Sequence, residues 1–215
     1  MLVAMNVGWK PTALASSLPD VPPSLLKVAD HAVVCVGARI TGPFSVVIGE
    51  GVVVHPGSRI AAVDRDITIG SGCIIEEKAM LLGISRGDGL SDGGTTGGSL
   101  VIGSNSLFRV GCIVQATSIG HGCVFGIKAS IGPLSVVGNG CHIGPGVIVP
   151  GGASIDDNSS LVHPFTANRV VPLLAERQAA ACLQHAAVLQ QLLPRFHNVV
   201  KSASAATATA VATPK

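Results

Sequence analysis

The feature that most restricts the fold is a branched aliphatic residue or phenylalanine at every sixth position in the second half of the chain. Glycine follows each of the first five members of this series, and mostly small residues stand two places before the members. A period of six matches neither the 3.6-residue period of an α-helix nor the alternation of an ordinary strand. It is typical of a solenoid in which one short strand and one tight corner recur. The eight members of the unbroken series are Ile119, Phe125, Ile131, Val137, Ile143, Val149, Ile155 and Leu161.

The same period extends towards the N-terminus, but it is interrupted. The series begins at Val36, includes Gly42 as a weak member, and has three extra residues after Ile60. A long insertion occupies residues 83–99, and one residue is missing before Ile119. Three hexads make one triangular coil of about 18 residues, and coils stack at the strand spacing of about 4.8 Å. The sequence therefore predicts about six coils of parallel strands.

Repeats of this kind resemble the left-handed parallel β-helix, and the expected handedness comes from that resemblance. We predict an all-β fold, a left-handed parallel β-helix with one C-terminal α-helix. The predicted segments are an irregular, proline-rich lead-in (1–27), the β-helix with its loop insertion (28–171, insertion 83–99), a helix that packs on the β-helix (172–201) and a disordered, low-complexity tail (202–215).

The predicted helix is recognised by a change of period to a helical one from about Pro172. Its apolar stripe is expected to pack against the prism, and Pro194 is expected to limit its far end. A β-helix leaves unpaired strand edges at its ends, so a covering element at the C-terminal end serves the fold. The stripe consists of Cys182, Ala186, Leu189, Leu193 and Phe196.

Composition narrows the function classes. Aromatic residues make up 3% of the chain and Tyr is absent, which suits a narrow core of small side chains. The formal net charge is only +2, so there is no basic patch to indicate a nucleic-acid partner. The N-terminus has no basic region before an apolar block, and we therefore expect neither a signal peptide nor membrane insertion. The expected location is the cytoplasm.

The six cysteines contain no Cys-x-x-Cys pair, which favours reduced thiols that pack as small hydrophobic residues rather than zinc ligands or disulfides. Three of them, Cys73, Cys123 and Cys141, stand two places before a core aliphatic residue. That is a position where a small inward side chain is needed.

Two enzyme classes use hexapeptide β-helices, and each needs histidine. A carbonic-anhydrase type of site needs three imidazoles, two of them commonly five residues apart, so that zinc keeps one open position for water. His121 lies in the matching stretch, but the second position holds Gly126, so the ligand set is incomplete.

An acyltransferase needs a general base, usually histidine, beside a groove between subunits. Four histidines occupy positions that resemble corners of the repeat, but no recognisable acyl-donor element accompanies them. These residues are His55, His121, His142 and His163.

Two further features of the sequence could suggest a binding or catalytic site. The insertion 83–99 contains Arg86-Gly87-Asp88 and glycine-rich stretches, but neither an integrin-type signal nor a calcium loop is complete, so a projecting loop is predicted. Glu76 and Glu77 are adjacent, which disfavours an acid/base pair because neighbouring strand residues face opposite ways.

Beyond the repeat, the chain resembles the small hexapeptide-repeat subunits of the dynactin complex, and within them the subunit-six type. The interruptions of the period also resemble that family's irregularities, although stacking does not require them at those places. Arg109 departs from the pattern, which usually has an acid there. The matching residues are Lys27-Val28-Ala29, Ala32-Val33-Val34-Cys35-Val36, Val54-His55-Pro56, Arg59-Ile60, Ile74-Ile75-Glu76-Glu77, Ala79, Ile102-Gly103, Asn105, Phe108, Val110-Gly111-Cys112, Gln115-Ala116, Lys128-Ala129, Gly132, Leu192-Leu193-Pro194 and His197.

The resemblance implies a non-enzymatic scaffold subunit, with no catalytic residue, metal or cofactor. It implies a place in the pointed-end complex of dynactin, which supports dynein-driven, microtubule-based transport and binding of cargo adaptors. The implied partners are the related subunit five, an actin-related protein and a p62-like subunit, with dynein adaptors reached indirectly, and the implied location is cytoplasm and cytoskeleton. The alternative is a homotrimeric acyltransferase-like or gamma-carbonic-anhydrase-like enzyme. The residues expected to contact partners are His55, Arg59, Glu77, Arg109 and Lys128.

Overall fold

The computed structural model describes residues 18–84, 98–163, 166–169, 172–197 and 199–200. Most of the predicted lead-in and insertion, and the whole predicted tail, therefore lie outside the described residues. No helix within the described ranges is both long enough and apolar enough to cross a membrane.

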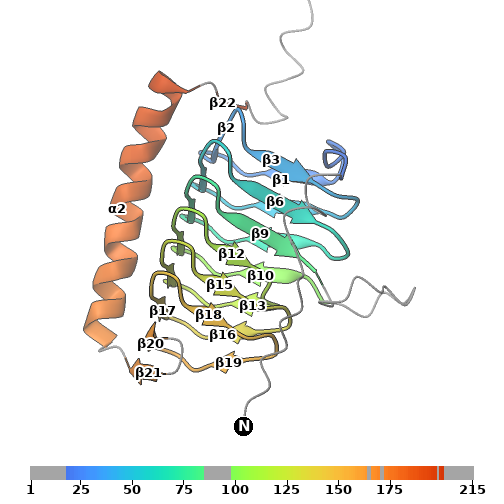
Figure 1. Cartoon of the computed structure of the whole chain (residues 1–215). Helices are drawn as coiled ribbons and strands as arrows, with labels where there is room; N and C mark the ends of the chain where they lie inside the picture. The colour runs from blue at the N-terminus through green and yellow to red at the C-terminus, as the bar shows by residue number, and fades with distance from the viewer. Residues whose placement is uncertain (1–17, 85–97, 164–165, 170–171, 198, 201–215) are drawn as a thin grey trace, which may run out of the picture.

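The described chain winds into a triangular prism of short parallel strands (Figure 1). It passes from a first face to a second and then a third, and it turns counter-clockwise as it recedes from the N-terminal end, so the solenoid is left-handed. Six complete coils are followed by the first two strands of a seventh. The predicted fold class is confirmed.

Each face is one sheet. The first face contains β1 (Leu26–Val28), β4 (Val46–Ile48), β7 (Ile67–Ile69), β10 (Leu100–Ile102), β13 (Ser118–Ile119), β16 (Val136–Val137) and β19 (Ser154–Ile155). The second contains β2 (Val33–Cys35), β5 (Val53–Val54), β8 (Ile74–Ile75), β11 (Leu107–Phe108), β14 (Val124–Phe125), β17 (His142–Ile143) and β20 (Ser159–His163), with β21 (Thr166–Arg169) and β22 (Val199–Val200) at its two ends. The third contains β3 (Arg39–Thr41), β6 (Arg59–Ala62), β9 (Met80–Gly83), β12 (Ile113–Val114), β15 (Ser130–Ile131) and β18 (Ile148–Val149).

The three corners of the prism are named after the faces that they join. The first edge joins the first face to the second, the second edge joins the second to the third, and the third edge leads back to the first. All three predicted interruptions, after Ile60, at residues 83–99 and before Ile119, fall at the third edge. The other two edges keep the same length in these coils, so strands on the faces stay in register.

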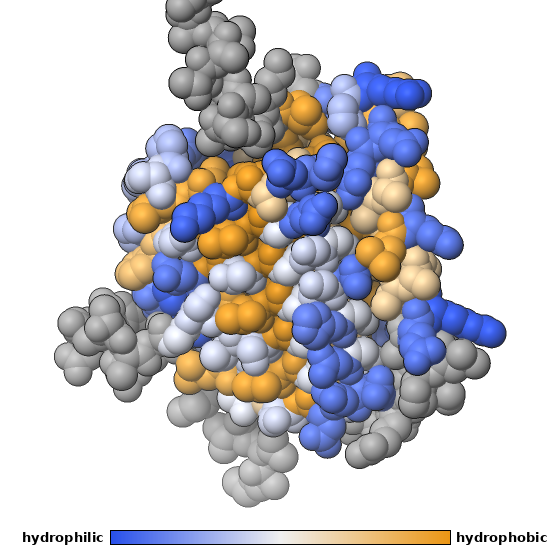
Figure 2. All heavy atoms as spheres, turned by 180° about the vertical axis from the view of Figure 1, so that it is seen from behind, coloured by the Kyte–Doolittle hydropathy of each residue, from blue (hydrophilic) through white to orange (hydrophobic). Residues whose placement is uncertain are grey.

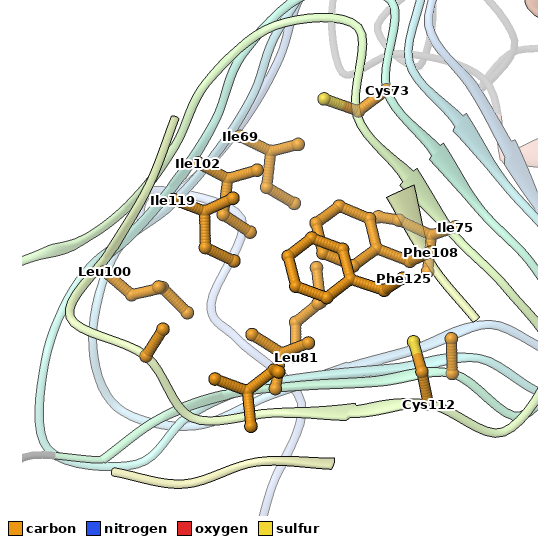
Figure 3. Packing of buried hydrophobic residues seen from close by; sticks show 14 of the residues in the cluster. Ile69, Cys73, Ile75, Leu81, Leu100, Ile102, Phe108, Cys112, Ile119 and Phe125 are labelled. Carbon is orange, nitrogen blue, oxygen red and sulfur yellow. The ribbon is translucent and has the colours of Figure 1, made fainter. Parts of the chain in front are cut away.

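The six-residue series forms the inside of the prism (Figure 3). On the second face Phe108 lies in register between Ile75 and Phe125, and the rings of Phe108 and Phe125 stack with centroids 4.9 Å apart. On the first face Ile102 and Ile119 are in register in the same way. Each aliphatic residue therefore packs on its counterpart one coil away, and this repeated contact explains why the period is read so clearly from the sequence.

The predicted start of the series at Val36 is wrong. Val34 pairs with Val54 and points into the core at 4% exposure, whereas Val36 is 55% exposed. The phase was misread because eight residues, not six, separate the inward positions Ile40 and Ile48. The two extra residues are again accommodated at the third edge.

All six cysteines are buried and unbridged, as predicted. Some of these thiols also donate hydrogen bonds. The Sγ of Cys73 donates to the carbonyl oxygen of Gly103 at 3.1 Å, and the Sγ of Cys123 donates to that of Gly138 at 3.1 Å. Burial raises the pKa of Cys73 to about 12, so this thiol stays protonated.

The helix α2 (Pro172–Phe196) runs back along the second face (Figure 1). Its 25 residues extend about 37 Å, and the nine strands of the second face extend about 38 Å, so the helix matches the sheet in length. Cys182, Ala186 and Leu193 are buried as predicted, but Phe196 is 77% exposed and does not belong to the stripe. The helix also continues for two residues beyond Pro194.

The C-terminal segment seals both ends of the second face. β21 pairs antiparallel with β20, the last coil strand, and β22 pairs antiparallel with β2, the first. Between them, Gln190 Nε2 on α2 donates to the Gly51 carbonyl oxygen at 2.7 Å. At the N-terminal end of the third face, the N–H of Val21 donates to the Ile40 carbonyl at 3.0 Å. Backbone groups that would otherwise be open to strand addition are thus occupied.

Candidate functional site

The second edge collects four of the five residues predicted to contact partners. His55, Glu77, Arg109 and Lys128 follow β5, β8, β11 and β14, so they lie in four successive coils along this edge. The fifth, Arg59, opens β6 on the third face next to the same corner. Coils are about 4.8 Å apart, so the four residues span about 15 Å. Residues far apart in the chain thus form one column along the edge, although Glu77 and Lys128 lie one and two residues further round the corner than His55 and Arg109.

The members of this column differ in accessibility. Glu77, Arg109 and Lys128 are exposed, whereas His55 and Arg59 are half-buried. Lys128 has a φ of 57°, a left-handed conformation that the corner imposes, and its N–H donates to the Val110 carbonyl oxygen at 3.0 Å. The corner backbone is therefore fixed.

His55 is less open than expected of a surface residue. Its Nε2 is buried and has no hydrogen-bond partner among the described residues. Burial lowers the pKa of His55, the neighbouring Glu76 and Glu77 oppose the shift, and His185 and His197 add to it. The ring is held near the C-terminal part of α2 in its neutral form.

Arg109 is one of the free positive charges of the column. No ion pair to its guanidinium exists within the described ranges. The nearby Glu76 is engaged with the backbone, because its Oε2 accepts the N–H of Val110 at 2.9 Å. In the next coils of the second face, burial first and Arg109 second lower the pKa of His142.

A groove of about 460 Å³ lies between α2 and the second edge. Its floor is formed by outward side chains of the second face, one wall by the second edge, and the other wall by α2. The floor residues are Leu107, Val124 and His142; the edge contributes Arg109, Gly126, Ile127 and Pro145; the helix contributes Gln178, Ala181, Cys182 and His185. Sequence reasoning missed this groove because α2 and the edge meet only in the fold.

Among the four histidines considered as general bases, only His55 and His121 lie at corners. His142 lies in β17 and faces the groove, and His163 lies in β20. His121 has a structural role at the first edge. Its Nδ1 accepts the N–H of Ser104 at 2.9 Å, and its own N–H donates to Asn139 Oδ1 at 2.9 Å.

Gly126, where a zinc site of the carbonic-anhydrase type would need its second imidazole, is tightly packed. A Cβ at this position would lie 2.5 Å from the backbone nitrogen of Pro145 in the next coil. A side chain here would require that coil to move. Across the described part of the chain, no group of three His, Cys, Asp or Glu residues is placed to hold a metal ion.

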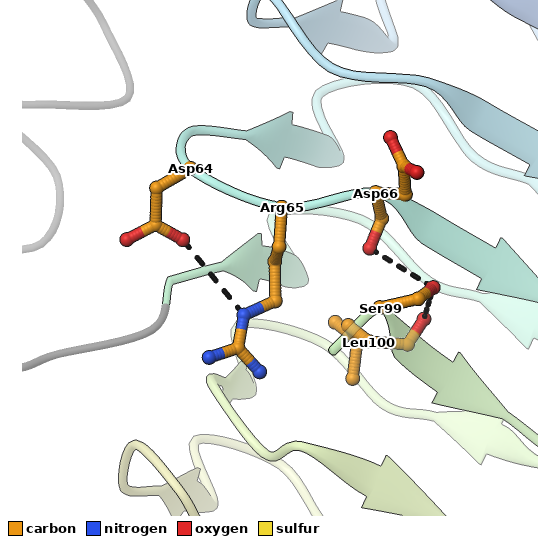
Figure 4. A network of polar contacts seen from close by, with 5 residues as sticks. All are labelled: Asp64, Arg65, Asp66, Ser99 and Leu100. Carbon is orange, nitrogen blue, oxygen red and sulfur yellow. Dashed lines mark hydrogen bonds and ion pairs between the residues drawn. The ribbon is translucent and has the colours of Figure 1, made fainter. Parts of the chain in front are cut away.

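A polar cluster around the buried Arg65, at the third edge, was also not anticipated (Figure 4). Arg65 is 3% exposed and its Nε lies 3.8 Å from Asp64, while its Nη1 has no hydrogen-bond partner among the described residues. Ser99 Oγ donates to the Asp66 carbonyl oxygen at 3.2 Å, and Asp66 Oδ1 accepts the N–H of Ser45 at 2.8 Å. The Ser99 contact ties the C-terminal end of the insertion to the three-residue break.

Comparison with known proteins identifies relatives over most of the chain. Dynactin subunit 6 of Xenopus tropicalis is 34% identical over 177 residues, which cover 82% of this chain and 85% of that protein. Dynactin subunit 6 of Danio rerio is 33% identical, with 82% and 88% covered, and that of Nematostella vectensis is 32% identical, with 84% and 95% covered. No family model matches the chain.

Among solved structures, a hexapeptide transferase family protein from Anaplasma phagocytophilum aligns with a TM-score of 0.51. The alignment covers 80% of this chain and 92% of that one, at 16% sequence identity. This likeness concerns the fold.

Proposed function

The chain belongs to the family of dynactin subunit 6, and on that premise we propose that it is a non-enzymatic scaffold subunit of dynactin. The proposal rests on relatives of one name that align over more than four fifths of both chains. In this role the protein occupies the pointed-end complex in the cytoplasm, associated with the cytoskeleton. There it supports dynein-driven transport and the binding of cargo adaptors.

The surroundings of the histidines support a structural role. His121 is hydrogen-bonded into the first edge, and the ring of His55 is tucked beside α2. A side chain at Gly126 would collide with the next coil. A stacked prism sealed along one face presents stiff flat faces and edges, which suit docking between subunits.

The proposed docking surface is the second edge, with His55, Arg59, Glu77, Arg109 and Lys128 contacting neighbouring subunits. Both signs of charge occur along this column, so it can orient a partner as well as attract it. The proposed neighbours are the related subunit five, the actin-related protein and the p62-like subunit. Adaptors are reached through this assembly.

Native purification tests the proposal. The tagged chain, expressed in its own cells, is expected to co-elute with these companions, identified by mass spectrometry. A variant with Glu77→Lys, Arg109→Glu and Lys128→Glu should lose them, whereas Lys27→Glu, which lies on the first face and gives the same change in net charge, should not. A symmetric homotrimer without these companions would instead support the enzyme alternative, and equal recovery with both variants would remove the second edge as the docking surface.

A further inference from the structure

We propose that the groove between α2 and the second edge binds an acidic, extended segment of a partner chain, with a carboxylate paired to Arg109. The inference rests on the proposed function in that the partner is taken to be a neighbouring subunit. It adds the chemistry of the contact and its place on the molecule.

The charges of the groove favour a negatively charged occupant. Its lining includes one guanidinium, from Arg109, but no carboxylate. Arg109 has no ion pair in the described structure. The nearest acids along the edge are Glu76, whose Oε2 accepts a backbone N–H, and Glu77. A planar guanidinium with free donors binds a carboxylate through two parallel hydrogen bonds, which a partly enclosed site strengthens.

Hydrogen bonding points to a peptide rather than to a simple anion. Gln178 lines the groove from α2, and its Oε1 is buried without a hydrogen-bond partner among the described residues. A buried acceptor of this kind is costly unless a donor reaches it. An occupant that satisfies both Arg109 and Gln178 must supply a carboxylate and an N–H, as an extended acidic peptide does.

The rest of the groove is apolar and of suitable size. Leu107 and Val124 form the floor, and Ile127, at 43% exposure, and Pro145 form the edge wall. A volume of about 460 Å³ lies within the range of sites that hold small ligands or a few side chains. The expected segment therefore places one aliphatic side chain on the floor between acidic residues.

The chain itself does not offer such a segment nearby. Residues 1–17 and 201–215 contain neither Asp nor Glu, and the acids of residues 85–97 are Asp88 and Asp92. That stretch is joined to the prism at Ile84 and Gly98, at the third edge, across the prism from α2. The occupant is accordingly assigned to another chain.

A direct binding measurement tests the groove. Fluorescein-labelled Glu-Leu-Glu-Leu-Glu and Lys-Leu-Lys-Leu-Lys are titrated against the full chain and followed by fluorescence anisotropy. We expect the acidic peptide alone to bind, Arg109→Ala to weaken it at least tenfold, Gln178→Leu to weaken it severalfold, and Lys27→Ala on the first face to leave it within twofold. Absence of binding, equal binding of both peptides, or an unchanged affinity of Arg109→Ala overturns the proposal.

Cross-linking separates this inference from the proposed function. Benzoylphenylalanine replaces Ala181 in the groove or, as a control, the exposed Leu183 on the opposite side of the α2 stripe, and the natively purified assembly is irradiated. Cross-links from position 181 are expected within an acidic segment of a companion subunit. If the assembly forms but position 181 captures a neutral or basic segment, or nothing, the inference fails alone. If the acidic peptide binds but no companion co-purifies, the proposed function fails while the groove chemistry stands.

Discussion

The first and second faces of the prism share their inner architecture but differ on the outside. Both carry an inward ladder of hydrophobic residues, aliphatic on the first face and with Phe108 and Phe125 among the aliphatic residues on the second. On the second face the outward positions are apolar through four coils, and α2 covers them. The outward residues of these coils are Val53, Ile74, Leu107 and Val124.

On the first face the outward positions of four successive coils alternate between a hydroxyl residue and a valine. Thr68, Val101, Ser118 and Val136 alternate there without a charge, and Val101 and Val136 are 47% and 44% exposed. Figure 2 shows this side of the prism, with rows of hydrophobic and neutral residues beside a column of hydrophilic ones. The inward repeat thus determines the fold. The outward residues determine which face α2 covers and which face stays exposed to solvent.

The strongest test of this difference places one carboxylate on each face. Ala186→Glu puts a charge between α2 and the second face, where Ala186 is 2% exposed, and should lower the free energy of unfolding by about 3 kcal/mol or more. Val136→Glu, at 44% exposure on the first face, should change it by less than about 0.5 kcal/mol. Urea unfolding followed by circular dichroism measures the stability of both variants. Equal unfolding midpoints would contradict the difference between the two faces.

A smaller effect is expected from truncating the stripe of α2. Leu193 is 7% exposed against the second face, so Leu193→Ala should cost about 2 kcal/mol through lost burial and the cavity left behind. Phe196 is 77% exposed, and Phe196→Ala should cost less than about 0.5 kcal/mol. If thermal and urea unfolding showed a larger loss of unfolding free energy for Phe196→Ala than for Leu193→Ala, the assignment of residues to the buried stripe would be wrong.

Thiol labelling should reveal whether α2 opens before the prism. Cys35 and Cys182 pack between the helix and the second face, whereas Cys73 and Cys112 lie inside the prism. At low urea concentrations, iodoacetamide should label the first pair at least tenfold faster, equivalent to about 1.4 kcal/mol of opening free energy. Mass spectrometry of quenched samples gives the rates. Labelling of all four at one rate would mean that helix and prism unfold together.

The smallest expected effect is a pH dependence confined to the helix-covered side. Burial lowers the pKa values of His55 and His142, while the unfolded chain binds these protons below about pH 6.5. The unfolded state then holds more protons than the native state, so the free energy of unfolding should fall as pH drops through and below about 6.5. The strands of the first face contain no histidine.

The control for this pH effect is the double variant His55→Gln with His142→Gln. Its stability, measured by urea unfolding between pH 7.5 and 5.5, should depend less on pH than that of the native chain. A steeper dependence in the double variant, or stability that rises on acidification, would contradict the assignment to these two rings.

The regular parts of the molecule could be predicted because each inward residue repeats one contact. Ile119, Phe125 and Ile131 follow the six-residue period without exception, and the period gives the coil directly. Val36 was misassigned because two extra residues at the third edge, between Ile40 and Ile48, shift the phase, and a shift of this kind leaves no local mark in the sequence. Phe196 was misassigned because the helical spacing of apolar residues continues to it, although its side chain is 77% exposed in the last turn of α2.

The candidate site was accessible to sequence reasoning only in part. The partner-contact residues, Arg109 among them, came from a family resemblance, and the fold then brought four of them into one column. The groove beside Arg109 depends on Gln178 and His185, which a distant helix carries to the second edge. This contact between α2 and the second edge depends on the direction and length of α2. Neither the period of the helix nor that of the β-helix predicts them.

The antiparallel pairing of β22 with β2 has a consequence for synthesis on the ribosome. The first coils can stack as they emerge, because each needs only its predecessor. The pairing of Val34 with Val200, however, must wait until almost the whole described chain has been made. Until then the second face keeps an unoccupied edge and an uncovered apolar surface, which a nascent-chain chaperone can recognise. The β22–β2 pairing therefore distinguishes a completely synthesised chain from an incomplete one before the chain binds any other subunit.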